Sequence, residues 1–167
     1  MSRIAFMASR ADVAQAAMDD LVAIYGQVPP DEAEYIVALG GDGFMLHTLH
    51  GSQHLDIPVY GMNRGTVGFL MNEYHAEGLI DRLQSAEEEV ITPLAKRAIS
   101  ADGELHEALA INEVSLIRAG PQVAKLRISV DGRVRMEDLV ADGALDSTPA
   151  GSTAYNYSAH GPIIPIG

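Results

Sequence analysis

A tetrapeptide of glycine and aspartate constrains the fold of this chain more than any other segment. Gly40-Gly41-Asp42-Gly43 follows the apolar run 35–39 directly and precedes the helical pattern 44–50. A buried strand that turns through glycines into a helix is the repeating unit of a parallel α/β sheet. Ligands bind such sheets beyond the carboxyl ends of the strands, where helix N-termini offer N–H groups to phosphate. We therefore expect a site that handles phosphate groups at this turn.

Asp42 is the one residue of the turn that is not glycine. Its carboxylate would repel a bare phosphate, so it is better suited to accept a hydrogen bond or a proton from a hydroxyl, or to work beside a metal ion. The alternative is a tight turn in which Asp42 caps the helix. The tetrapeptide by itself leaves both interpretations open.

The first half of the chain alternates predicted strands and helices. A strand is expected over 3–8, a helix-start box at 9–12, and short strands over 35–39 and 58–61. The apolar face predicted for the first helix is Val13, Ala17, Leu21 and Ile24, before Gly26 ends it. A glycine-rich loop over 63–68 and a helix ending near 85 follow. This alternation predicts a parallel sheet with helices packed on it.

The second half has the two-residue period of antiparallel strands. Apolar and polar residues alternate over 125–130, and Asp131-Gly132 then turns the chain into 133–136. Asp102-Gly103 predicts another hairpin, between 98–100 and 105–108. The sequence therefore divides into an α/β domain over 1–90 and a β-rich domain over 91–167.

Composition restricts the partners of the protein. The formal net charge is −12 and Lys96 and Lys125 are the sole lysines, which argues against nucleic acid and anionic membranes. The sequence has no cysteine and no apolar run of about 20 residues, and its first residues lack signal-peptide features. These features predict a cytoplasmic protein. The run Glu87–Glu89 is interpreted as a solvated helix end rather than a metal site.

The segment 146–162 combines many hydroxyls and small residues with Tyr155 and Tyr157. A buried strand would need a partner for each hydroxyl, and a solvated loop would not need two tyrosines. The mixture favours a wall that hydrogen-bonds a sugar and a base, with a Ser/Thr-rich turn as the alternative.

Four motifs, in this order, resemble the NAD kinase family, also named inorganic polyphosphate/ATP-NAD kinase. They are the glycine turn 40–43, the segment Asn63-Arg64-Gly65-Thr66-Val67-Gly68-Phe69-Leu70, the pair Asn112-Glu113, and the segment 142–155 with Asp142-Gly143 and Ser147 to Tyr155. The glycine turn alone is shared with lipid kinases. The combination spans residues 40–162.

The resemblance implies transfer of a phosphoryl group from ATP or polyphosphate to the 2′-hydroxyl of the adenosine ribose of NAD, which gives NADP. It implies that Asp42 is the proton acceptor, that Gly43 lines the same site, and that Asn112 and Glu113 hydrogen-bond NAD. His47 is assigned a phosphate contact, with an ordinary surface histidine as an equal alternative. The other positions implied around the dinucleotide are Asp142, Ala150, Thr153, Ala154, Tyr155, Asn156, Tyr157 and Ser158.

Three features depart from the family pattern. Phe44 stands where threonine is common, and Ala150 stands where threonine or serine is common. Family members have about 250 to 300 residues, within the usual range for two-lobed chains. We therefore expect further residues after the apolar stretch 163–167, and we expect residues 1–167 alone to be inactive and poorly folded.

The resulting prediction is a phosphofructokinase-like α/β domain followed by a β-rich, sandwich-like dinucleotide-binding domain. The predicted enzyme is a homo-oligomer that uses a divalent metal ion, Mg²⁺ above others, on the donor phosphates. The ligands of that metal are not assigned. The alternatives are a lipid kinase of the diacylglycerol or sphingosine type and a non-catalytic NAD(P)-binding module.

Overall fold

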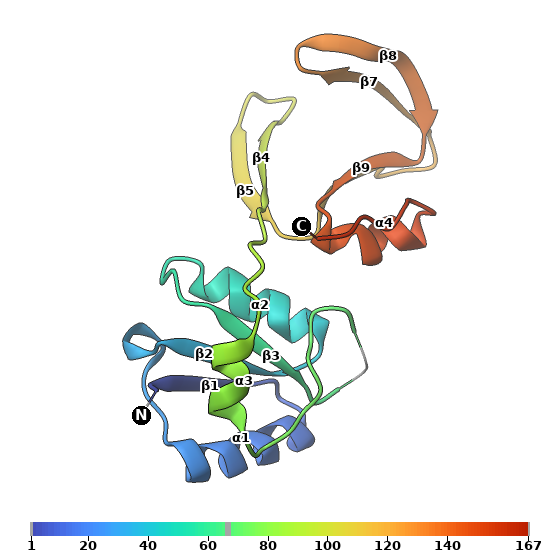
Figure 1. Cartoon of the computed structure of the whole chain (residues 1–167). Helices are drawn as coiled ribbons and strands as arrows, with labels where there is room; N and C mark the ends of the chain where they lie inside the picture. Colours follow the sequence, from blue (N-terminus) through green and yellow to red (C-terminus); the bar gives the residue numbers. More distant parts are fainter. Residues whose placement is uncertain (1, 66–67, 167) are drawn as a thin grey trace. The chain divides into compact units, whose positions relative to one another are not determined.

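The computed structural model describes residues 2–65 and 68–166, and it divides the chain into two compact units (Figure 1). The first unit is Met1–Glu88 and the second is Glu89–Gly167. The domain boundary expected from the sequence lies two residues further on. The predicted α/β unit followed by a β-rich unit is confirmed, and each unit is described by itself below.

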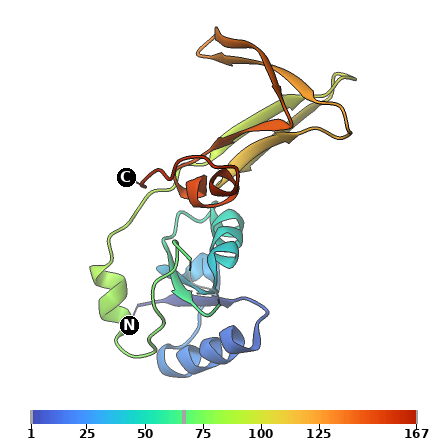
Figure 2. The same ribbon diagram turned by 90° about the vertical axis from the view of Figure 1, so that its right-hand side faces the viewer.

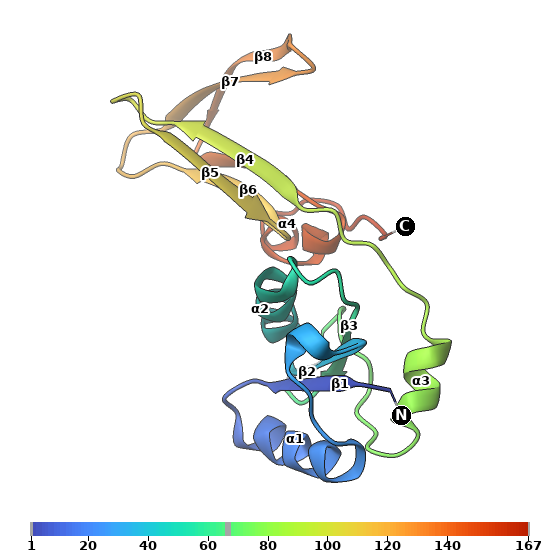
Figure 3. The same ribbon diagram turned by 90° about the vertical axis from the view of Figure 1, so that its left-hand side faces the viewer.

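The first unit is built on a parallel sheet with the strand order β1-β2-β3. Its elements in chain order are β1 (Ile4–Ala8), α1 (Asp12–Tyr25), η1 (Pro30–Glu32), β2 (Tyr35–Gly40), α2 (Asp42–Ser52), β3 (Val59–Asn63) and α3 (Leu79–Ser85). Helices lie on both faces of the sheet (Figures 1 and 3). Since each strand is followed by a helix, the carboxyl ends of all three strands lie at one edge.

Alternate residues of the strands form two separate cores. One face contributes Phe6, Val37 and Leu39, which pack against α1 and α3. The opposite face contributes Ala5 and Ile36, with Leu55 and Val59 packed against them. Strand β2 is the central strand and is buried on both faces, which explains why its sequence is a continuous apolar run rather than an alternating one.

The buried face of α1 differs from the predicted one. Ala14, Ala17 and Leu21 are buried, whereas Val13 is 47% exposed and Ile24 is 57% exposed. Small alanine side chains let the helix approach the sheet closely, and a search for large apolar residues overlooks them. The predicted start of the helix is also wrong in detail, because Ala11 is the N-cap residue and no side chain caps the helix.

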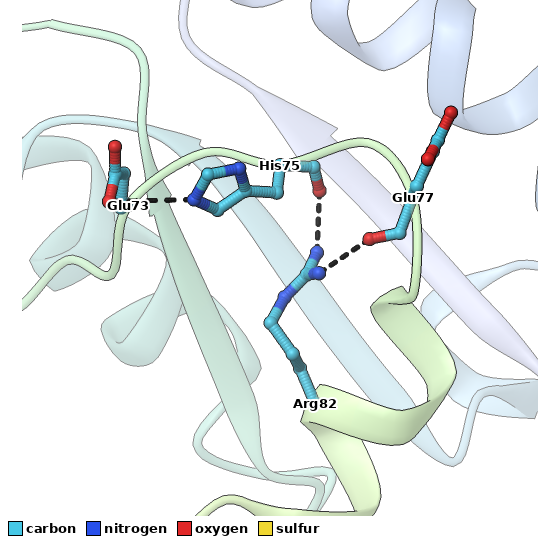
Figure 4. A network of polar contacts seen from close by, with 4 residues as sticks. All are labelled: Glu73, His75, Glu77 and Arg82. Carbon is cyan, nitrogen blue, oxygen red and sulfur yellow. Dashed lines mark hydrogen bonds and ion pairs between the residues drawn. The ribbon is translucent and has the colours of Figure 1, made fainter.

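Residues 75–77, just before α3, are fixed by hydrogen bonds to their backbone carbonyls. The Arg82 guanidinium donates to the carbonyls of Glu77 and His75, each at 2.5 Å, and His75 lies 3.4 Å from the Glu73 carboxylate (Figure 4). The Tyr25 hydroxyl donates to the Ala76 carbonyl at 2.8 Å. This polar network adds to the apolar packing of α3, whose Leu79 and Leu83 are buried in the core of the unit.

The second unit consists of three two-stranded antiparallel ladders (Figure 2). Its elements are β4 (Leu94–Ile99), β5 (Leu105–Ala110), β6 (Glu113–Ile117), β7 (Ala124–Val130), β8 (Arg133–Ala141), β9 (Gly143–Ser147), η2 (Ala150–Thr153) and α4 (Tyr155–Ser158). The hairpins β4–β5 and β7–β8 turn at the predicted Asp-Gly pairs, and Asp131 has a φ of 51° there. Strand β6 pairs with β9 across two intervening strands.

Two further expectations concern the surface. Glu87, Glu88 and Glu89 are exposed and follow α3 rather than forming its end. Over residues 2–65 and 68–166, no helix is long and apolar enough to cross a membrane.

Candidate active site

The glycine turn lies at the carboxyl end of β2, as the sequence predicts. Gly40 ends the strand, Gly41 is the N-cap residue of α2, and Asp42 is the first residue of the helix. A Cβ on Gly40 would lie 2.8 Å from the Cβ of Phe44, so the helix can follow the strand this closely only when residue 40 is glycine. Helix α2 begins two residues before the predicted start and has no side-chain cap.

The Asp42 carboxylate is held by a segment distant in sequence. Its two oxygens accept hydrogen bonds from the backbone N–H groups of Phe69 at 2.8 Å and Leu70 at 3.1 Å. The alternative in which Asp42 caps its own helix is therefore wrong. The two backbone N–H groups fix the orientation of the carboxylate at the carboxyl end of β2.

The backbone just after β3 is hydrogen-bonded to the glycine turn. Arg64 N–H donates to the Gly40 carbonyl at 2.7 Å, and the Asn63 side chain accepts from Gly65 N–H at 2.8 Å. The Arg64 guanidinium lies 4.1 Å from the centre of the Tyr74 ring. Beside it is an open hollow of about 620 Å³, with Val13, Asn72 and Glu73 among its lining residues. Thr66 and Val67 of the same motif lie outside the described residues.

Gly43 and His47 are both exposed on α2. A Cβ on Gly43 would meet nothing within 4 Å, which leaves open space on that side of the helix start. The His47 ring lies 6.4 Å from the Phe44 ring, centre to centre. Five residues along a helix correspond to about 140° around its axis, so His47 is on a different face from Asp42. The predicted contact of His47 with phosphate stays a prediction.

Asn112 lies immediately before β6, and the segment after β9 fixes its backbone. Its carbonyl accepts from the Thr148 N–H at 2.9 Å and from the Thr148 hydroxyl at 3.2 Å. A Cβ on Gly151 would lie 2.0 Å from that carbonyl oxygen. The pairing of β6 with β9 thus brings together two motifs about 36 residues apart.

Glu113 is the first residue of β6, and one of its carboxylate oxygens is unusual. Among the described residues, Glu113 Oε2 is a buried acceptor atom with no hydrogen-bond partner. Buried polar atoms almost always have a partner, so such an atom points to a group supplied from outside this unit. Within the described part of the chain, Arg82 Nε of the first unit is likewise without a partner, so the contact of Glu113 with NAD stays a prediction.

The hydroxyl-rich segment is partly interior and partly surface. Ser152 is fully buried; its hydroxyl donates to the Pro149 carbonyl at 2.6 Å and accepts from the Ile164 N–H at 2.9 Å. Ala150 is buried as well. Asn156 uses its side-chain amide to donate to the carbonyls of Ser152 and Pro162, so that amide stabilises the turn. The remaining predicted positions run from the half-buried Thr153 and Ala154 to the exposed Tyr155, Tyr157 and Ser158.

Asp142 lies at the other end of the β6–β9 ladder from Asn112. Its carboxylate pairs with Arg118 Nε at 2.5 Å, and its carbonyl accepts from Arg118 N–H at 2.9 Å. Six residues of antiparallel strand span about 20 Å. The structure therefore gathers Asn112, Glu113 and the start of the 150–158 segment, but it leaves Asp142 away from them.

The residues around Asp42 belong to the first unit, and those around Asn112 belong to the second. The sequence interpretation noticed the motif 63–70 but gave Phe69 and Leu70 no role toward Asp42. No local signal could have supplied it, because the contacts depend on backbone groups 27 and 28 residues away. In the parts of the chain that the structure describes, no group of three or more His, Cys, Asp or Glu residues is placed to hold a metal ion.

Two segments of the chain match protein-family models. Residues 5–88 match the model of the ATP-NAD kinase N-terminal domain, and residues 111–165 match the ATP-NAD kinase C-terminal domain. The chain belongs to the NAD kinase family. An NAD kinase of Cereibacter sphaeroides is 68% identical over 165 residues, which is 99% of this chain and 65% of that protein. An NAD kinase of Caulobacter vibrioides is 61% identical over 166 residues, covering 99% of this chain and 64% of that protein.

The fold of the chain is similar to that of a solved structure. The crystal structure of yeast NADH kinase complexed with NADH superimposes with a TM-score of 0.77 at 21% identity, over 98% of this chain and 62% of that one. At this identity the likeness shows the NAD kinase fold alone. The chain spans 65% of the length of its Cereibacter sphaeroides relative.

Proposed function

We propose that the protein is an NAD kinase, which transfers a phosphoryl group from ATP or polyphosphate to the 2′-hydroxyl of the adenosine ribose of NAD. Membership of the family and the conditions around Asp42 support this proposal. The observation that carries it is a carboxylate fixed by two N–H groups at the carboxyl end of β2, beside the start of α2. This is where α/β sheets bind phosphate-bearing ligands.

In the proposed reaction, Asp42 accepts the proton of the 2′-hydroxyl. The ribose oxygen forms a bond to the terminal phosphorus of the donor, and the bond from that phosphorus to the donor's bridging oxygen breaks. The products are NADP and the donor shortened by one phosphoryl group, with the proton on Asp42. A general base of this kind contributes about 10²–10⁴-fold to the rate.

The second unit is proposed to bind the dinucleotide. Glu113 Oε2 would accept a hydrogen bond from NAD, which would satisfy its buried lone pairs. Asn112, with its backbone fixed by Thr148, would present its side chain beside it. The exposed Tyr155 and Tyr157 offer stacking surfaces, and Thr153, Ala154 and Ser158 stay proposed contacts. Gly43 is proposed to line the acceptor site of the first unit, and His47 is proposed to contact phosphate.

A divalent cation belongs to the proposal as a companion of the donor. The described residues do not form a metal cage of their own. Mg²⁺ commonly enters kinase sites on the phosphates with one or two protein ligands. With a net charge of −12, the chain has few basic residues to neutralise a polyanion, and the cation would supply that charge.

The remaining parts of the proposal concern assembly and location. We propose a cytoplasmic homo-oligomer that binds neither nucleic acid nor membranes. The charge of −12 supports the exclusion of nucleic acid and anionic membranes as partners. The absence of cysteine supports the proposed location.

The test is direct. The purified full-length protein is incubated with NAD, Mg²⁺ and either ATP or polyphosphate, and NADP is quantified; a parallel arm replaces NAD with NADH. We expect NADP from at least one donor, and we expect Asp42→Ala to lower turnover by about 10²–10⁴-fold while NAD still binds. Phosphorylation of diacylglycerol or sphingosine without any NADP, or undiminished turnover in Asp42→Ala, would contradict the proposal.

A further inference from the structure

Gly68 lies against the carboxylate that carries the proposed reaction. A Cβ built on Gly68 would be 2.2 Å from the carboxyl carbon of Asp42 and 2.2 and 2.3 Å from its two oxygens. The next two residues, Phe69 and Leu70, donate their N–H groups to the same oxygens. We propose that Gly68 is a positioning residue, and that residues 68–70 form a backbone clamp that sets the orientation of Asp42.

Glycine is required at position 68 because a Cβ there has no space beside the Asp42 carboxylate. The atoms that a methyl group would meet are the end of the Asp42 side chain and not backbone. A larger residue would therefore be accommodated by rotation of the carboxylate out of the clamp, with the fold around it retained.

The clamp leaves the carboxylate able to act. Each carboxylate oxygen has about two lone-pair positions, and one on each oxygen is used by the N–H groups of Phe69 and Leu70. The others are available to a substrate hydroxyl. A displacement of about 1 Å at a reacting group costs on the order of 10²-fold in rate, so the role of Gly68 in catalysis rests on the proposed function of Asp42.

The same contact explains why the usual isosteric test of Asp42 is ambiguous here. In Asp42→Asn, one of the two atoms facing Phe69 N–H and Leu70 N–H would become an NH₂ group, which cannot accept a hydrogen bond. That variant would lose the proton acceptor and open the clamp together. Gly68→Ala separates the two effects, because it keeps the carboxylate and changes its position.

The kinetic test is a double-mutant cycle with Gly68→Ala and Asp42→Ala, and with Gly51→Ala as the matched control. Gly51 lies on α2, the helix that Asp42 begins, and a Cβ there meets nothing within 4 Å. We expect Gly68→Ala to lower kcat at least tenfold with the KM for NAD within threefold, and to have no further effect in Asp42→Ala. Gly51→Ala should retain wild-type kcat. An equal loss from Gly68→Ala in both backgrounds, or a change confined to KM, would overturn the proposal.

A second measurement does not depend on enzyme activity. Amide hydrogen exchange at Phe69 and Leu70 reports the clamp directly, and it should accelerate in Asp42→Ala and Gly68→Ala but not in Gly51→Ala. Unchanged exchange in Asp42→Ala would overturn the clamp even in an active enzyme. If exchange behaves as expected but the wild-type protein makes no NADP, the proposed function fails while the clamp stands.

Discussion

Residues 1–88 enclose Leu21, Val37 and Leu39 completely between sheet and helices, whereas Leu116 and Val140 in the hairpins of residues 89–167 are 60% and 57% exposed. Among the described residues of the second unit, Ala150 is the single apolar residue in the buried set. The difference follows from the connections. A parallel pair needs a crossover helix that covers the sheet, while a hairpin can be closed by as few as two residues and brings no cover.

The interiors differ in chemistry as well as in size. The buried polar residues of the second unit, Thr148 and Ser152, use their hydroxyls to join the segment after β9 to Ile111, just before β6, and to residue 164. The first unit is thus stabilised mainly by apolar burial. The second is stabilised mainly by local hairpins and by one cluster of hydrogen bonds around the Asn112 carbonyl. The following predictions test that contrast, from the largest expected effect to the smallest.

Leu21→Ala should destabilise the first unit by about 2–5 kcal/mol, the range for removal of a fully buried leucine. Leu116→Ala, the matched control in the second unit, should change stability by no more than about 0.5 kcal/mol, because its side chain is already 60% exposed. Denaturant unfolding of both variants measures the difference. A comparable loss in Leu116→Ala would show that the hairpin face is covered in solution and would break the contrast.

Gly151→Ala should cost about 1–3 kcal/mol, since its Cβ would lie 2.0 Å from the Asn112 carbonyl oxygen and the obstacle is backbone. It should also weaken NAD binding, because Asn112 and Gly151 would be forced apart. Gly120→Ala is the control in the same unit, since its Cβ would meet nothing within 4 Å. Thermal unfolding and NAD titration measure both effects. Equal stability and equal NAD affinity of the two variants would contradict the role of the hydrogen-bond cluster around the Asn112 carbonyl.

Ser152→Ala should cost about 1–3 kcal/mol, because the Ile164 N–H loses its acceptor and the Pro149 carbonyl loses a donor in the fully buried site of Ser152. Ser129→Ala, on an exposed position of β7, should be neutral. Amide exchange at residue 164 reports the loss locally. If Ser152→Ala is as neutral as Ser129→Ala, apolar burial must support this unit after all.

The smallest effect concerns the turn of the β4–β5 hairpin. The Ser100 hydroxyl donates to Asp102 and, with the backbone N–H groups of Asp102 and Glu104, lowers the pKa of the Asp102 carboxyl below 3.8. A depressed pKa in the folded state adds stability that is present above 3.8 and is lost as the pH falls through the folded value. We expect Ser100→Ala to raise the pKa of Asp102 toward 3.8 and Ser100→Thr to retain the shift, as followed by NMR titration of the carboxyl carbon. An identical titration in the wild type and Ser100→Ala would contradict this account.

Much of the fold was predictable from local chemistry. The glycine turn after an apolar strand, the hairpins at Asp102-Gly103 and Asp131-Gly132, and the change of period near residue 90 each depend on neighbouring residues. The strand β9 (Gly143–Ser147) was not predicted, and its last residues, Asp146 and Ser147, belong to the hydroxyl-rich segment. Strand β8 extends to Ala141, beyond the predicted 133–136. Its ladder with β7 continues past two register shifts next to Ile128 as far as the pair Ala124 and Ala141.

The sequence by itself determined the family, the order of α/β and β-rich halves, and the residues of the glycine turn, since motif order and short-range periodicity are properties of the chain alone. Tertiary structure decided which face of α1 is buried, that Asp42 is held by Phe69 and Leu70, and that Asn112 is fixed by Thr148. These three outcomes depend on backbone groups or surfaces that are distant along the chain. A hydrogen bond to a backbone N–H has no residue-type signature, so only the folded geometry can reveal it.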